Sequence, residues 1–202
     1  MLNASTSAGW SDVSFGDVHD QLVIGGASIS VDTRVNPSFP RNAVYASAGC
    51  EGLSPESGPT VNRFTLDGQA YLGLIGSSVL ALRARTETAD GPLPVYERAL
   101  VGGFGSLRGF SAGAFTGDNA ATASVELRLP FHSPLRLGQT GLTIFGDTGA
   151  AYEHGVALAD ARFEYGVGGG WYLRVPLFQF EIDVAYGFDR GTRAHVMAGF
   201  KF

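Results

Sequence analysis

The sequence predicts an all-β protein whose strands form an antiparallel transmembrane β-barrel. Apolar and polar residues alternate along many segments, and a period of two is typical of strands rather than helices. These segments run for about 10 to 14 residues, longer than most strands of soluble sheets and long enough for a tilted membrane crossing. Aromatic residues gather near the segment ends, as in the interfacial girdles of membrane barrels, at Phe163, Tyr165, Trp171, Tyr186, Phe188, Phe200 and Phe202.

The alternation predicts about nine or ten strands. A weak first strand is predicted at Gly9–Phe15. The chain divides into residues 1–19, a linker or weak first strand, and residues 20–202, a barrel region with one long loop at 89–119. The nine clearer strands are predicted at 22–34, 42–51, 61–73, 77–88, 120–130, 140–151, 162–175, 176–188 and 193–202.

The two faces of the predicted strands differ in chemistry. In segment 176–188, Phe178, Ile182 and Val184 share one face, whereas Glu181 and Asp183 share the other. In a soluble sandwich or lipocalin-like barrel the apolar face would point inward, whereas in an outer-membrane barrel it faces lipid. The polar faces carry small residues and charges of both signs, which favours a packed lumen and therefore the membrane barrel.

The composition excludes several classes of protein. Glycine accounts for 29 of the 202 residues and charged residues for 16%, whereas an ordinary soluble domain is about 25% charged. The net charge of −5 argues against a nucleic-acid-binding protein. The single cysteine, Cys50, excludes a disulfide framework and a cysteine-based zinc site, and the four histidines are far apart. We therefore predict no metal site.

The longest connection between predicted strands contains a glycine-rich run over Gly102–Phe110. Long loops of this kind are usually functional or disordered. This loop is predicted to be ordered, because its apolar residues can pack and its glycines permit tight turns. Arg108 is the only charged residue between Arg98 and Asp118.

The run Leu107, Arg108, Gly109, Phe110 resembles a loop motif, (V/I/L)RG(F/Y), of the BamA/TamA-type outer-membrane assembly and translocation superfamily. In that family the loop folds back into the barrel lumen, and its arginine pairs with the aspartate of an F-x-D-x-G motif on the second strand after the loop. Phe145, Asp147 and Gly149 stand at this place, and the alternation independently puts all three on the polar face. The resemblance spans about residues 20–202, with further matches at 32–34, 94–98 and 117–119.

The resemblance implies an architecture and a function. Barrels of this family have sixteen strands preceded by periplasmic POTRA domains, and the strands found here correspond to the last nine. Gly199, Phe200 and Phe202 resemble the C-terminal assembly signal of such barrels. The implied role is assembly and insertion of outer-membrane proteins, or polypeptide translocation, in a Gram-negative bacterium, without cofactor or enzymatic activity. The implied partners are outer-membrane lipid and unfolded outer-membrane or secreted polypeptides.

Closure of the barrel is a separate expectation. The sequence contains neither POTRA domains nor a secretory signal, and an odd number of antiparallel strands cannot close. We therefore expect either a fragment that lacks the N-terminal half of the barrel, or a short relative. A short relative would close by adding the weak first strand or by pairing with a second copy.

The predicted role of Arg108 is a conformational latch. Arginine is always charged and can bind a carboxylate through two hydrogen bonds, and Asp147 would compensate a buried charge that would be costly alone. The alternative is that Arg108 is an exposed loop arginine.

Other functions also remain open. They are a passive pore, a structural or anchoring barrel such as that of a patatin-like secreted protein, and a soluble barrel that binds an apolar ligand. The run Gly109–Gly113 matches the G-x-S-x-G motif of hydrolases but lacks the strand–turn–helix context, so no catalytic residue is predicted. His195 is predicted to be a hydrogen-bonded residue of the lumen.

Overall fold

The computed structural model describes residues 1–37, 39–131, 138–175 and 178–200. Ten strands form one antiparallel sheet in the order β1-β2-β3-β4-β5-β8-β9-β10-β11-β12. The first five are β1 (Leu2–Phe15), β2 (Val18–Asp32), β3 (Ala43–Pro55), β4 (Val61–Gly73) and β5 (Val79–Ala89). The last five are β8 (Asn119–Phe131), β9 (Gln139–Tyr152), β10 (Glu164–Val175), β11 (Phe178–Gly187) and β12 (Gly191–Phe200).

The structure confirms the all-β antiparallel class and the nine clearer strands. The weak strand expected at Gly9–Phe15 is part of a longer strand that starts at Leu2, so the sheet has ten strands. Between β5 and β8, the short strands β6 (Ala99–Val101) and β7 (Phe115–Gly117) pair with each other. Two single-turn 3₁₀ helices, η1 (Val95–Glu97) and η2 (Leu158–Asp160), lie in loops. Among the described residues, no helix is long and apolar enough to cross a membrane.

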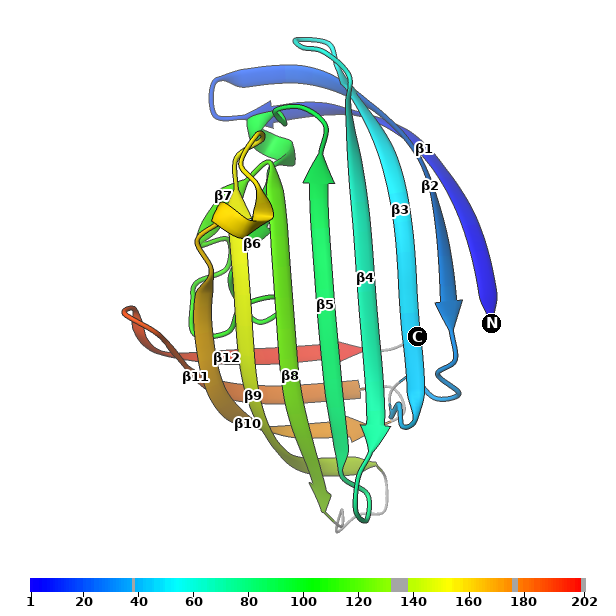
Figure 1. The fold of residues 1–202 in the computed structure, drawn as a ribbon, viewed down its shortest axis with the longest axis vertical. Coiled ribbons are helices and arrows are strands. Elements are labelled where there is room, and N and C mark those ends of the chain that lie inside the picture. Colours follow the sequence, from blue (N-terminus) through cyan, green and yellow to red (C-terminus); the bar gives the residue numbers. More distant parts are fainter. Residues whose placement is uncertain (38, 132–137, 176–177, 201–202) are drawn as a thin grey trace.

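The sheet curls around an interior. Figure 1 shows β3, β4, β5 and β8 side by side and close to vertical, while β10, β11 and β12 cross behind them. The green segment between β5 and β8 folds onto the concave side (Figure 1), where its residues hydrogen-bond to inward-facing side chains. The order of the sheet ends at β1 and β12, and within the described ranges no ladder joins these two strands.

The burial of alternate residues is the reverse of that in a soluble protein. On β11, Glu181 and Asp183 are buried, whereas Ile182 and Val184 are exposed, Val184 by 51%. The same holds on β9, where Asp147 is buried and Ile144 is exposed. Charged side chains therefore line the concave face and apolar ones cover the convex face, as a lipid-facing barrel wall requires.

On the β10–β11 hairpin, aromatic residues of the convex face form two groups at opposite ends. Tyr186 and Phe188 pack edge-to-face with ring centroids 5.7 Å apart at one end. Trp171 and Phe180 do so at 6.1 Å near the other end. Two aromatic groups on the apolar face, separated along the strands, match the positions of interfacial girdles. Phe202, also expected in a girdle, lies outside the described residues.

The concave face carries small apolar clusters beneath the loop between β5 and β8. One consists of Leu22, Leu53, Val61, Ala89 and Leu93. A second consists of Ala99, Val101, Leu107, Phe110 and Ala120. Leu93 and Leu107 belong to the loop, and each packs against residues of the sheet, such as Leu53 and Ala120. Burial of apolar surface therefore holds the loop against the inner wall.

The assignment of the two faces predicts unequal effects of a charge placed on neighbouring residues of β4. Leu66 is exposed on the convex face and Thr65 lines the concave face. We expect Leu66→Lys to lower the free energy of unfolding from lipid vesicles by about 2–4 kcal/mol, because the ammonium would enter hydrocarbon. Thr65→Lys is the matched control and should change it by less than about 1 kcal/mol. Equal losses, measured by denaturant titration, would contradict a lipid-facing convex surface.

Candidate functional site

The base of the loop between β5 and β8 is fastened by two adjacent polar residues. Asp118 accepts hydrogen bonds from the backbone N–H of Leu93 at 2.9 Å and of His154 at 2.8 Å. Burial opposes ionisation of Asp118, but these two hydrogen bonds together with the nearby charge of Arg98 outweigh it and lower the pKa of its carboxyl. Asn119 accepts a hydrogen bond from the backbone N–H of Ala89 at 2.9 Å. The N-terminal part of the loop, which follows β5, is thus tied to the C-terminal part, which precedes β8. Both are tied to the β9–β10 connection.

The N-terminal part of the loop is also tied to the start of β2 and, through it, to the connection between β3 and β4. The hydroxyl of Tyr96 donates a hydrogen bond of 2.6 Å to Asp20, which also accepts one from the Ser57 hydroxyl at 2.6 Å. Burial and the hydrogen bond to Asp20 raise the pKa of Tyr96 to about 12, so the phenol remains a donor at neutral pH. Arg98, in the same part of the loop, forms ion pairs with Asp118 and Glu153.

The descending part of the loop turns sharply at glycines. Gly102, Gly103 and Gly109 have φ values of 125°, 86° and 95°, a region that side chains rarely adopt. The hydroxyl of Ser106 accepts a hydrogen bond from the backbone N–H of Gly102 and donates one to its carbonyl oxygen. This turn directs the backbone of Arg108 toward the inner wall of the sheet.

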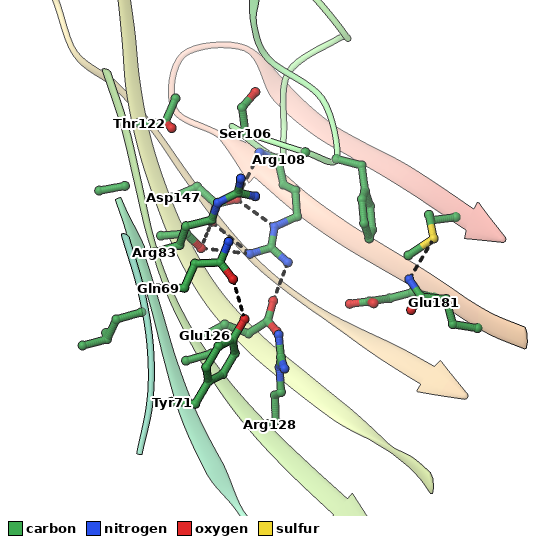
Figure 2. A pocket seen from close by; sticks show the side chains of 18 of the residues that line it. Gln69, Tyr71, Arg83, Ser106, Arg108, Thr122, Glu126, Arg128, Asp147 and Glu181 are labelled. Atoms are coloured by element: carbon green, nitrogen blue, oxygen red, sulfur yellow. Dashed lines mark hydrogen bonds and ion pairs between the residues drawn. The ribbon is translucent and has the colours of Figure 1, made fainter. Parts of the chain in front are cut away.

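Arg108 lies among three carboxylates, those of Glu126 on β8, Asp147 on β9 and Asp183 on β11, which we call the carboxylate cradle. Its Nε and Nη2 donate to the two oxygens of Asp147 at 2.8 and 2.9 Å, and its backbone N–H donates to Asp147 at 3.1 Å. Its Nη1 donates to Glu126 at 2.8 Å and to Asp183 at 3.2 Å. Figure 2 shows the guanidinium between Asp147 and Glu126.

Further contacts hold the guanidinium in one orientation. The Ser124 hydroxyl donates to Asp147 at 2.7 Å and accepts from Nη2 of Arg108 at 3.3 Å. The ring of Phe145 lies against the guanidinium, with 3.3 Å between Cζ of Arg108 and the ring centroid. A planar cation stacked on an aromatic face and bound side-on by a carboxylate is an arrangement that only arginine forms well.

The electrostatic balance keeps Arg108 charged although the residue is only 6% exposed. Burial would by itself lower its pKa, but the hydrogen bonds and charges of Asp147, with those of Glu126, raise it above the usual value of arginine. The cradle also contains more negative charge than one guanidinium neutralises. Arg128 neutralises part of the remaining negative charge, since its Nε donates a hydrogen bond to Glu126 at 2.8 Å.

Glycines in the barrel wall make room for the loop tip. A Cβ atom placed on Gly166 would collide with the carbonyl oxygen of Arg108. One on Gly168 would come within 2.7 Å of the Phe145 ring, and one on Gly187 within 2.9 Å of the Phe110 ring. The loop tip therefore packs against bare backbone of the wall at Gly166, Gly168 and Gly187, which we call the glycine floor. These positions account for part of the high glycine content.

A polar cavity of about 270 Å³ adjoins the guanidinium. Its lining includes Arg83, Arg128, Arg174, Glu181 and Gln69 (Figure 2). Arg83 is paired with Asp67 at 2.7 Å and Arg174 with Glu181 at 3.5 Å. Paired charges line this cavity, so its surface is hydrophilic without a large net potential. Across the described residues, no group of three or more His, Cys, Asp or Glu side chains is arranged to hold a metal ion.

The structure brings together the residues of the two motifs singled out in the sequence. Arg108 contacts Asp147 and Phe145, while Leu107 and Phe110 lie in the apolar cluster beside them. Gly149 lies beneath Val101, where a Cβ would come within 3.0 Å of a Val101 methyl group. Of the three residues of the C-terminal signal, Gly199 and Phe200 end β12, whereas Phe202 and the side chain of Phe200 lie outside the described structure.

Sequence reasoning did not identify the other members of the site. The alternation places Asp183 on the polar face, but it does not identify Asp183 or Glu126 as a partner of Arg108. Ser124 has no role in the sequence-based prediction. The signal that could have found them is the register, because Ser124 lies opposite Asp147 and Glu126 lies opposite Phe145 on the neighbouring strand.

Two comparisons with known proteins agree with this geometry. A family model described as "Omp85 superfamily domain" matches residues 5–202. Among solved structures, the fold is similar to the crystal structure of BamA from Haemophilus ducreyi lacking POTRA domains 1–3, with a TM-score of 0.60 and 12% sequence identity. The likeness covers 99% of this chain and 59% of that one. In the search of curated proteins, nothing matches.

The buried network predicts strong energetic coupling between Arg108 and Asp147. We expect Arg108→Ala alone to lower the free energy of unfolding by about 3–5 kcal/mol, because it leaves buried carboxylates unpaired. A double-mutant cycle with Asp147→Ala should give a coupling energy above about 1 kcal/mol. The pair Arg85–Glu87, whose arginine is exposed, is the control, with a coupling of about 0–1 kcal/mol. Additive effects at Arg108 and Asp147 would refute the coupling.

The glycine floor predicts a position-dependent effect of a single methyl group. Gly166→Ala should lower the free energy of unfolding by about 1–3 kcal/mol, because the methyl would displace the backbone at Arg108. Gly146→Ala is the control: its methyl would make an ordinary contact of 3.7 Å with Val125 on the convex face. Thermal or denaturant unfolding of both variants checks this. A loss at Gly146 as large as that at Gly166 would show that glycine matters here only through strand propensity.

Proposed function

Because the chain belongs to the Omp85 superfamily, we propose that it helps other polypeptides to insert into or cross the outer membrane of a Gram-negative bacterium. The loop tip at Leu107, Arg108, Gly109 and Phe110 acts in this proposal as a latch, meaning a segment that is either seated on the inner wall or withdrawn from it. The role is mechanical and involves no catalytic residue, metal or cofactor.

The observation that carries the proposal is the burial of a charged loop residue in the carboxylate cradle. A passive pore needs only a polar lining, which the serines and charged pairs of the concave face already supply. A guanidinium bound by three carboxylates costs desolvation energy that hydrophobic packing would avoid. In the proposal this network gives the loop two discrete states, seated and released, because the ion pairs stabilise the loop only while their partners are in contact.

The proposed partners follow from the surfaces. Outer-membrane lipid covers the convex face, whose exposed side chains are apolar. Unfolded outer-membrane or secreted polypeptides are the proposed clients. The chain spans 59% of the length of the BamA chain that it resembles, so we propose that the edges at β1 and β12 pair with further barrel strands or with a second copy. The ten strands from β1 to β12 act as the barrel region, and Gly199, Phe200 and Phe202 as its own assembly signal.

Reconstitution tests the proposal. The chain is folded into phospholipid vesicles, and the rate at which an unfolded outer-membrane β-barrel client folds into them is measured. We expect a higher rate than in empty vesicles, and a decrease of about tenfold for Arg108→Ala, equivalent to about 1.4 kcal/mol of barrier. Arg85→Ala, an exposed arginine of the same lumen, is the control and should match the unaltered protein.

A different result would favour a passive or anchoring barrel. In that case the vesicles would conduct ions, client folding would be no faster than in empty vesicles, and Arg108→Ala would change neither quantity. Circular dichroism of each reconstituted variant ensures that only folded protein is compared.

A further inference from the structure

The loop tip contacts the terminal hairpin of the sheet as well as the carboxylate cradle. The backbone N–H of Gly109 donates a hydrogen bond of 3.2 Å to Nε2 of His195 on β12. His195 lies directly opposite Asp183 of the cradle in the β11–β12 ladder. Since β12 is an edge strand of the described sheet, this hydrogen bond connects the loop tip to a strand that has a neighbour on one side only.

Close packing of backbone accompanies this hydrogen bond. A Cβ on Gly109 would lie 2.6 Å from the backbone nitrogen of Gly187, and a Cβ on Gly187 would lie 2.7 Å from the carbonyl oxygen of Gly109. Both positions therefore exclude side chains, and the loop backbone lies in direct contact with the end of β11. The contact brings Gly109 close enough to the hairpin for the imidazole of His195 to reach its N–H.

The direction of the hydrogen bond fixes the chemical state of His195. The donor is a backbone N–H, so Nε2 is the acceptor and carries no proton. The imidazole is then neutral, with its proton on Nδ1. A protonated imidazole, or the other tautomer, would place two hydrogens between Gly109 and His195 and break the contact.

We propose that His195 is a positioning residue that holds the loop tip on the β11–β12 hairpin by accepting the hydrogen bond from Gly109. The inference rests on the proposed function, in which the loop tip seats and withdraws. His195 adds a second attachment beside the Arg108–Asp147 pair, and this attachment joins the latch to the edge strand. Among the described residues, the Gly109–His195 hydrogen bond is the only hydrogen bond between the loop and β12. Withdrawal of the loop breaks it, so the latch and the edge strand move together.

Amide hydrogen exchange in the folded, vesicle-bound chain tests the proposal, with peptides covering residues 103–113 as the readout. His195→Phe keeps a ring but removes the acceptor, and should speed exchange in these peptides about fivefold, the effect of one net hydrogen bond. His195→Gln keeps an acceptor oxygen within reach and should restore slow exchange to within about twofold. Met197→Leu, on the same strand and face, is the matched control and should leave exchange unchanged.

Two outcomes would overturn the proposal. Exchange in His195→Phe equal to that of the unaltered protein would show that the hydrogen bond does not hold the loop. Equal acceleration in His195→Phe and His195→Gln would show that ring packing matters rather than the acceptor. No client is present in this measurement, so its failure is distinguishable from failure of the insertion activity.

A measurement on the unaltered protein covers the case in which the variants do not fold. A long-range ¹H–¹⁵N spectrum of histidine-labelled protein at neutral pH reports which ring nitrogen is protonated. We expect Nε2 of His195 to be unprotonated. A proton on Nε2 would overturn the proposal without any substitution.

Discussion

The structure depends on the burial of one positive charge, that of Arg108, inside a wall built for it. The guanidinium is bound side-on by Asp147, end-on by Glu126 and Asp183, and from one face by the ring of Phe145. Each of the four charged groups would be unfavourable in the interior without the others, because a buried charge without a partner is strongly destabilising. The network is therefore cooperative: it is stable when complete, and it gives the loop one defined seat.

The rest of the sheet is arranged around this seat. Glycines at positions 166, 168 and 187 remove side chains where the loop backbone and its aromatic partners come close to the wall. Asp118 and Asn119 tie the base of the loop at the other end. The unusual composition has the same origin: half of each strand faces lipid and carries few charges, and the wall under the loop is rich in glycine. Near-zero mean hydropathy, +0.10, is the average of the two faces.

Much of this fold could be predicted from the sequence, because the period of two is a local property. The alternation located the strands and placed Phe145, Asp147 and Gly149 on the inner face. The partner of Arg108 came from the resemblance of two motifs and not from the alternation. Glu126 and Asp183 could not be assigned to Arg108, because that requires the register of four neighbouring strands, which local pattern does not contain. The contact between Gly109 and His195 depends in addition on the path of the loop. The first strand was underestimated because its apolar residues are sparse between Leu2 and Trp10.

The most direct measurement of the central claim is the position of the loop tip relative to the wall. Spin labels at Gly105, where a side chain would meet open space, and at Leu142 on the convex face of β9 report this distance by pulsed electron paramagnetic resonance, in a Cys50→Ser background. If Arg108 seats the loop, the unaltered network gives one narrow distance distribution, and Arg108→Ala makes it broad or shifts it. The same narrow distribution in both proteins would contradict the account, because the loop would then keep its place without the buried charge.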